Sequence, residues 1–283
     1  MKIDTTSGDF DYTFLSLGAG VQSSALLVLS CTDDRVPKPD VAIFADTGDE
    51  PEYVYSYLRL LTEWAKPHGV DVLTATAGVL SDNVREVVKA AEESLDSKVS
   101  GWVSVPLYTS RDGHSTGMRA RACTGQYKIR PLRQKVREIL GYQPGQRVRE
   151  RVRSLVGITI DEAQRMKAAQ AKWLTNSYPL VDLGLHRHDC LKIMVDAGLP
   201  EPKKSACVYC PYHDDTHWQW MKDEQPLEFQ KAVEFDEMIR AESTGFPAFV
   251  HRSMKPLSEV EFNTKDPNQV NLFTNECEGM CGV

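Results

Sequence analysis

The residues Tyr12-Thr-Phe-Leu-Ser-Leu-Gly-Ala-Gly-Val-Gln-Ser-Ser-Ala-Leu, positions 12–26, indicate the fold class, because an apolar strand pattern passes through a glycine turn into a helix pattern. Gly18 and Gly20 allow the backbone to approach an anion, and the helix offers free N–H groups and the positive end of its dipole. No Lys-Ser or Lys-Thr pair follows the glycines, which excludes a Walker loop, and Ser23 excludes the dinucleotide fingerprint. We expect an anion-binding loop; the alternative is a glycine turn without a ligand.

Strand and helix patterns alternate along most of the chain. Strands are predicted at 12–17, 41–45, 70–74 and 155–159, and helices at 23–30, 51–66, 82–93, 131–140, 161–172 and 187–197. Pro51 suits the first turn of its helix, and Asp161 is expected to be an N-cap. This alternation predicts an α/β fold, a Rossmann-like parallel sheet with helices on both faces, followed by a small helical C-terminal part. The loops after the first, second and fourth strands should open on one edge, where such sheets bind ligands.

The bulk composition narrows the class of protein. The chain has 283 residues, 41% of them hydrophobic, and contains no apolar run of 18 residues that could cross a membrane. Its N-terminus is polar and acidic, unlike a signal peptide. Seven cysteines, an odd number, do not indicate a secreted disulfide framework. We expect a cytoplasmic protein whose cysteines are metal ligands, reactive thiols or core residues.

Four motifs carry a resemblance to a known family. The segment Ser16-Leu-Gly-Ala-Gly-Val-Gln-Ser-Ser resembles the PP-loop of ATP pyrophosphatases and phosphoadenylyl-sulfate (PAPS) reductases, with Leu17 in place of a glycine and Gln22 where an Asp is usual. Those two departures favour the reductase-like branch. The other three motifs follow in the family's order: Ala45-Asp-Thr-Gly-Asp-Glu-Pro-Glu-Tyr, Gly157-Ile-Thr-Ile-Asp-Glu-Ala-Gln-Arg, and the segment from Tyr178 to Ala206-Cys-Val-Tyr-Cys-Pro.

The resemblance implies a nucleotide site and a division of the chain. A PP-loop nucleotide-binding domain would cover residues 1–200, a cysteine-bearing helical segment 201–262, and a mobile tail 263–283. Asp46 would lie near the nucleotide or its Mg²⁺, although a plain loop acid or helix cap is the alternative. The residues expected to bind ATP or an adenylyl sulfate are Ser16, Gly18, Gly20, Gln22, Ser23, Ser24, Asp46, Thr47, Gly48, Gly157 and Arg165.

Three cysteines form a candidate metal site. Cys207 and Cys210 belong to a CxxC-Pro sequence, and Cys123 lies among basic residues. Two thiolates on one turn and a third from a distant loop can hold a 4Fe–4S cluster, as in the iron–sulfur tRNA thiolases and cluster-bearing adenylyl-sulfate reductases that this arrangement resembles. The alternatives are zinc, with His213 as a fourth ligand, and unliganded or redox thiols.

The remaining cysteines divide between core and tail. Cys31 and Cys190 lie on apolar helix faces and are expected in the core. Cys277 and Cys281 lie in the polar C-terminal tail, where they are candidate catalytic thiols. Glu276-Cys277-Glu-Gly is similar to the nucleophilic Glu-Cys-Gly-x-His tail of PAPS reductases, but has an inserted Glu278 and lacks the histidine. A disordered tail with incidental thiols is the alternative.

Charge is distributed unevenly. The segment from Arg119 to Arg153 contains eleven Lys or Arg residues and two acids, a local charge of +9. Because the net charge of the whole chain is −7, the remaining residues carry −16. Such a stretch can attract nucleic acid or polyphosphate, or it can be a solvated helix face paired with acids elsewhere.

Two enzyme activities and one binding function fit these motifs. In the first, ATP adenylates a substrate oxygen, pyrophosphate leaves, and sulfur replaces the adenylate, in tRNA or in DNA phosphorothioation. In the second, an adenylyl sulfate is reduced, with Cys277 as nucleophile. A non-enzymatic nucleotide sensor is the third. The expected partners are a nucleic acid bound through Arg119–Arg153, a sulfur donor such as a cysteine desulfurase, and a second copy of the chain; no membrane is expected.

Overall fold

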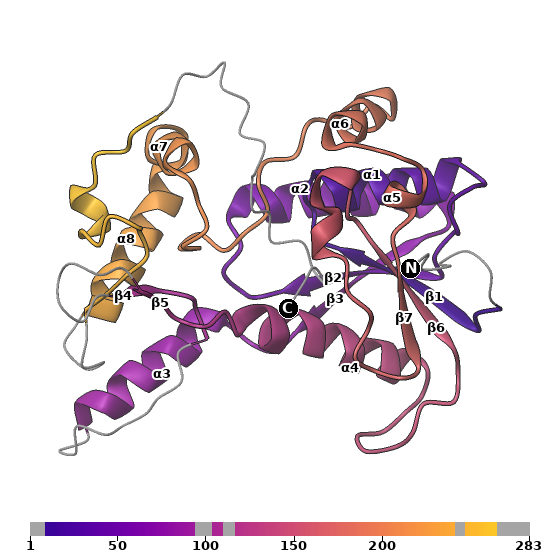
Figure 1. The fold of residues 1–283 in the computed structure, drawn as a ribbon, viewed down its shortest axis with the longest axis horizontal. Coiled ribbons are helices and arrows are strands. Elements are labelled where there is room, and N and C mark those ends of the chain that lie inside the picture. Colours follow the sequence, from indigo (N-terminus) through magenta and orange to yellow (C-terminus); the bar gives the residue numbers. More distant parts are fainter. Residues whose placement is uncertain (1–8, 94–103, 110–116, 241–246, 265–283) are drawn as a thin grey trace.

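A computed structural model describes residues 9–93, 104–109, 117–240 and 247–264. Its centre is a five-stranded sheet of β1 (Tyr12–Leu17), β2 (Val41–Asp46), β3 (Asp71–Thr76), β6 (Val152–Val156) and β7 (Leu174–Ser177). The strand order is β3-β2-β1-β6-β7, and every pair is parallel. The chain reverses its direction of winding between β1 and β6, so the sheet has a topological switch point there (Figure 1).

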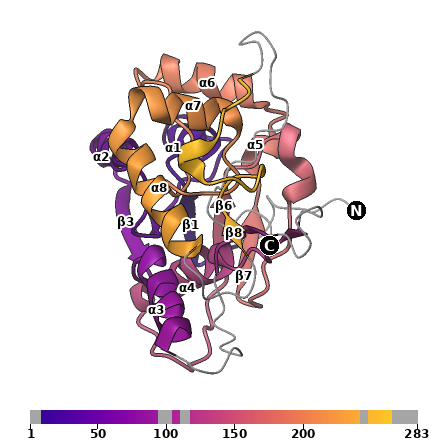
Figure 2. The same ribbon diagram turned by 90° about the vertical axis from the view of Figure 1, so that its left-hand side faces the viewer.

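Alternation along the strands directs side chains to two apolar layers. Leu15 and Leu17 pack with α1 (Val21–Thr32), α2 (Glu52–Ala65), α5 (Pro179–Asp182) and α6 (Arg187–Asp196). Phe14 packs on the opposite face with α4 (Arg130–Ile139), through Leu132 and Val136. Figure 2 shows α1, α2 and α6 on one side of the sheet and α4 on the other. The predicted α/β sheet with helices on both faces is confirmed.

A second core joins sequence from the middle and the end of the chain. Its elements are α3 (Leu80–Glu93), α7 (Asp215–Glu224), α8 (Pro226–Arg240) and a small antiparallel sheet of β5 (Gly117–Met118), β4 (Tyr108–Thr109) and β8 (Ala248–Phe249). Trp218 is fully buried in this core, where Leu80 and Leu107 pack with residues of α7 and α8. Shorter turns occur at Lys66–His68, Thr124–Ile129, Ile160–Arg165 and Leu257–Glu259. The boundary placed at residue 200 stays a prediction, and residues 265–283 of the tail lie outside the described residues.

Most predicted elements occur near their expected positions, but one prediction is wrong. No regular α-helix forms at 161–172; instead a 3₁₀ segment, Ile160–Arg165, contains a kink at Glu162 and leads to the unpredicted strand β7. Long-range bonds explain the difference. The Asp161 carboxylate accepts from the backbone N–H of Arg187 (2.7 Å) instead of capping a helix, and the Lys167 N–H donates to the Tyr178 hydroxyl (2.9 Å). The strand expected at 155–159 begins at Val152 instead.

Within the described ranges, no helix combines the length and apolar character needed to span a bilayer.

Candidate functional site

The loop between β1 and α1 lies at the switch point of the sheet and is held in shape by contacts within the chain. Ala19 adopts a left-handed conformation (φ 57°), which is uncommon for a residue with a side chain, and Gly20 caps α1. The Gly18 N–H donates to the Ser23 hydroxyl (3.1 Å), which ties the loop to the first turn of the helix. The Ser16 hydroxyl is buried and has no hydrogen-bond partner among the described residues. A donor left in this state next to a helix N-terminus suits an anion.

Gly157, which directly follows β6, lies in close contact with the backbone of Gln22 and Ser23 at the start of α1. A Cβ atom at this position would lie 2.7 Å from both the Cα and the N of Ser23 and 2.9 Å from the carbonyl carbon of Gln22. These are backbone atoms, which cannot rotate away, so only glycine fits. The predicted contact of Gly157 with a nucleotide stays a prediction, but its contact with the residues that follow the β1–α1 loop is direct.

Gln22 connects the loop to charged residues that are distant in sequence. Its amide Nε2 donates to Glu162 (3.1 Å), and its Oε1 accepts from the Arg187 guanidinium (3.1 Å). Glu162 also forms an ion pair with Arg165. A glutamine side chain can serve a carboxylate and a guanidinium together because it carries both a donor and an acceptor, whereas an aspartate only accepts. Sequence reasoning missed Arg187 and Glu162; the unusual Gln22 was the only signal for them.

The loop after β2 is shaped around Asp46. One carboxylate oxygen accepts from the Gly48 N–H (2.8 Å) and from the Tyr55 hydroxyl (2.8 Å). Gly48 has φ 76°, and a Cβ there would lie 2.9 Å from a methyl carbon of Val79. Burial and the Asp46 carboxylate raise the pKa of Tyr55, so that phenol keeps its proton. Asp46 therefore holds this loop in shape, and its contact with nucleotide or Mg²⁺ stays a prediction.

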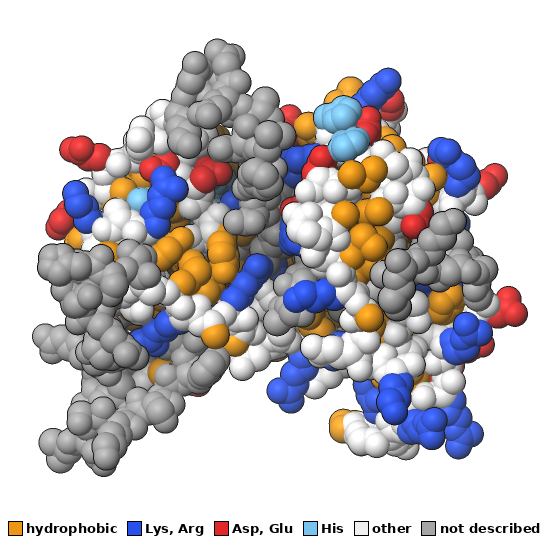
Figure 3. Space-filling model, in the orientation of Figure 1, with side chains coloured by type: hydrophobic (Ala, Val, Ile, Leu, Met, Phe, Trp, Pro, Cys, Tyr) orange, Lys and Arg blue, Asp and Glu red, His pale blue; other side chains and the backbone are white. Residues whose placement is uncertain are grey.

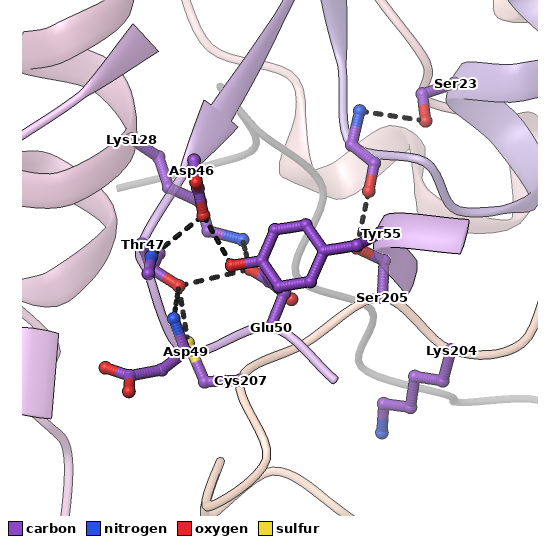
Figure 4. Close-up of polar contacts among 12 residues, drawn as sticks. Ser23, Asp46, Thr47, Asp49, Glu50, Tyr55, Lys128, Lys204, Ser205 and Cys207 are labelled. Carbon is purple, nitrogen blue, oxygen red and sulfur yellow. Dashed lines mark hydrogen bonds and ion pairs between the residues drawn. The ribbon is translucent and has the colours of Figure 1, made fainter. Parts of the chain in front are cut away.

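Figure 4 shows a buried polar cluster directly behind this loop. The Thr47 hydroxyl lies 3.2 Å from Cys207 Sγ and 3.4 Å from Glu50. Lys128 Nζ forms an ion pair with Glu50 at 3.2 Å, and the Glu50 side chain is fully buried. Burial and the Glu50 charge raise the pKa of the Cys207 thiol well above its ordinary value. Glu50 and Lys128 were not among the predicted site residues.

The structure brings together the three cysteines predicted to bind metal. Cys123, Cys207 and Cys210 line one small pocket, with Arg121 and Lys128 also in its wall. Among the described residues, however, no group of three or more His, Cys, Asp or Glu side chains is arranged to hold a metal ion. His213, considered as a fourth zinc ligand, has its Nε2 3.0 Å from the Cys207 carbonyl oxygen.

Besides the contact between Thr47 and Cys207, further hydrogen bonds join the cysteine segment to the loops after β1 and β2. The Ser205 hydroxyl donates to the Gly18 carbonyl, and the Val208 N–H donates to the Asp49 carbonyl (2.9 Å). These hydrogen bonds connect the loop expected to bind phosphate and the Asp-Thr-Gly loop to the segment that carries Cys207 (Figure 4).

Of the other cysteines, Cys190 is fully buried in the main core and Cys31 packs against it, which confirms that interpretation. Cys277 and Cys281 lie outside the described residues.

Comparison with solved structures gives a structural likeness. No protein-family model and no curated protein matches the chain. The chain is similar to a PAPS reductase from Candida auris, solved as a phosphate complex, with 14% sequence identity over 68% of this chain and 76% of that chain, and a TM-score of 0.39.

Proposed function

We propose that this chain is a PP-loop enzyme that uses ATP to adenylate a substrate oxygen and then directs sulfur to the activated position, with tRNA or DNA as the acceptor. The observation that supports this most is the direct contact between the Asp-Thr-Gly loop and the cysteine pocket, through Thr47 and Cys207 (3.2 Å). Nucleotide activation and thiol chemistry would then take place side by side, without transfer between distant sites.

The bond changes balance as follows for a carbonyl acceptor. Its oxygen attacks the α-phosphorus of ATP, an oxygen–phosphorus bond forms, and the α–β anhydride breaks to release pyrophosphate. The terminal sulfur of a donor persulfide, such as that of a cysteine desulfurase, would then form a bond to carbon, and AMP would leave with the former carbonyl oxygen. A second thiol would attack the inner sulfur of the persulfide, so that the sulfur–sulfur bond breaks, the transferred sulfur stays on carbon, and the two thiols become a disulfide. The backbone N–H groups at the start of α1 would bind the phosphates. Arg165 and Arg187, held at the loop through Gln22 and Glu162, would neutralise charge on the departing pyrophosphate. Asp46 would hold Mg²⁺ at the end of β2.

Cys123, Cys207 and Cys210 are proposed to hold an iron–sulfur cluster. Three thiols in one pocket wall, with Lys128 and Arg121 to offset negative charge, match in kind the donors of a cluster with one open iron, although their side chains are not arranged here to hold a metal ion. Such a cluster supplies a position at which sulfur can bind before transfer. Protein purified without oxygen should be brown and absorb broadly near about 400 nm. Cys207→Ala should bleach it and Cys31→Ala should not; colourless protein with stoichiometric zinc would refute the cluster.

Reduction of an adenylyl sulfate is the second candidate, favoured by the sequence Glu276-Cys277 in the tail. Incubation with ATP labelled at the α-phosphate separates the two activities. Sulfur insertion requires AMP and pyrophosphate, formed faster when acceptor nucleic acid is added. Release of sulfite from an adenylyl sulfate, without cleavage of ATP, would establish the reductase instead. Gly18→Val should weaken nucleotide binding strongly in isothermal titration, because the added side chain occupies the path of the phosphate.

A further inference from the structure

Helix α4 presents three arginines on one face. Arg130, Arg133 and Arg137 follow at spacings of three and four residues, which places them in one row. Leu132 and Val136 occupy the face that packs on the sheet. The arginine row is therefore separate from the packing surface of the helix.

The row borders a hollow of about 320 Å³, whose wall also includes Gly125 and Gln170. Arg133 is half-buried, and its Nε is buried without a hydrogen-bond partner in the part of the chain that the structure describes. Burial also lowers the pKa of Arg133. A guanidinium removed from water in this way calls for an anionic partner.

The described carboxylates do not neutralise this row. Of the ion pairs formed among described residues, none includes Arg130, Arg133 or Arg137, although Lys135 on another face of α4 pairs with Glu138 at 3.1 Å. The positive charge of the row is thus not offset by a carboxylate of the described residues.

The basic surface continues beyond the helix. The Arg137 guanidinium donates to the carbonyls of Gln143 (2.8 Å) and Gln146 (2.6 Å), which fixes the following loop. Arg147 and Arg149 line a second hollow there. Figure 3 shows Lys and Arg side chains gathered at the lower edge of the molecule, where Figure 1 places this loop.

The other end of the row leads to the cysteine pocket. Gly125 lines the arginine hollow, and Cys123, two residues earlier, lines the cysteine pocket. A ligand lying along the arginines would therefore have one end close to the thiols.

We propose that this hollow binds the phosphodiester backbone of one strand of a nucleic acid and leads the acceptor nucleotide toward the cysteine pocket. The proposal rests on the proposed function, whose acceptor it places. From Arg130 to Arg137 the helix advances about 10 Å, at about 1.5 Å per residue. Three guanidiniums spread over that length give charge complementarity to the phosphates of one strand without base readout.

The test measures binding of a fluorescein-labelled, 20-nucleotide single-stranded RNA, and of DNA with the same sequence, by anisotropy between 50 and 200 mM NaCl. Arg130→Gln/Arg133→Gln removes two contacts and should lower the slope of log affinity against log salt by about 1.4, at about 0.7 per phosphate. Affinity at 100 mM NaCl should fall at least tenfold. Lys135→Gln, which removes one charge on another face of α4, should leave the slope unchanged. Thermal unfolding of each variant checks that it folds.

Nucleotide binding is measured on the same proteins. Wild type, the double arginine variant and Lys135→Gln should bind ATP with equal affinity, because the arginine hollow does not include residues of the loop proposed to bind ATP. A wild-type slope in the double variant, or no binding of either oligonucleotide by wild type at 50 mM NaCl, would overturn the inference. Arginine-dependent binding of adenosine 3′,5′-bisphosphate that displaces the RNA would assign the hollow to a small nucleotide and overturn it equally. Arginine-dependent RNA binding by a wild-type protein that does not bind ATP would uphold the hollow and refute the proposed function.

Discussion

Replacement of Gly157 by alanine tests whether β6 positions the loop between β1 and α1. The new Cβ would lie 2.7 Å from the Cα and N of Ser23, where ordinary contact begins at 3.4 Å. The start of α1 must therefore retreat by about 0.7 Å, the difference between these distances, or β6 must move by as much. Overpacking of this kind costs about 1–3 kcal/mol in free energy of unfolding. Displacement of catalytic groups by about 1 Å can cost a factor of about 100 in rate.

We expect Gly157→Ala to lower the melting temperature by several degrees and the rate of AMP formation by about 10- to 100-fold. The assays are thermal unfolding and release of labelled AMP at saturating ATP. Val195→Ala serves as the control, because Val195 is 67% exposed on α6 and should change neither quantity. Wild-type stability and rate in Gly157→Ala would refute the close contact, and lost stability with an unchanged rate would limit Gly157 to packing.

Three further predictions follow from buried or paired groups. Lys128→Met leaves the Glu50 carboxylate buried without its cation (3.2 Å) and should cost about 3–5 kcal/mol in urea unfolding; Lys128→Met/Glu50→Gln should recover much of this, and equal loss in both variants would contradict the pairing. A hydrogen bond to Asp161 raises the pKa of His186 in the folded protein. The stability that this pair contributes is therefore complete below the pKa of the histidine in the unfolded chain, and it is lost as pH rises through the pKa of His186 in the folded protein. NMR titration should show a His186 pKa above about 6.5 that falls in Asp161→Asn, and an unchanged value would exclude the pair. Gln22→Leu removes both amide bonds and should weaken ATP binding about tenfold in isothermal titration, whereas unchanged affinity would remove Gln22 from the site.

Local sequence patterns predicted the fold and the position of the glycine loop between β1 and α1, because strand alternation and glycine spacing act over a few residues. The strand–glycine–helix stretch around Gly18 and Gly20 occurs as predicted, with β1 at Tyr12–Leu17. Strand β7 was missed since Leu174–Ser177 is short and follows a polar, alanine-containing run that suggests a helix.

The charged part of the site could not be read from the sequence for a different reason. Gln22 contacts Glu162 across 140 residues and Arg187 across 165, and Lys128 reaches Glu50 across 78. No local pattern encodes such pairs, because chain topology alone brings them together. The cysteines were found because Cys207 and Cys210 share one turn, yet their contact with the Asp-Thr-Gly loop appeared only in three dimensions.

The central claim is that nucleotide activation and sulfur delivery share one site but depend on different residues. The most direct measurement is a single-turnover reaction of ATP labelled at the α-phosphate with acceptor nucleic acid and a sulfur donor, comparing wild type with Cys207→Ala. Wild type should release pyrophosphate and AMP and incorporate sulfur into the acceptor. Cys207→Ala should still release pyrophosphate but accumulate adenylated acceptor without sulfur, because the PP-loop is intact. Full sulfur incorporation by Cys207→Ala, or no cleavage of ATP by the wild-type enzyme with any nucleic acid, would contradict the account.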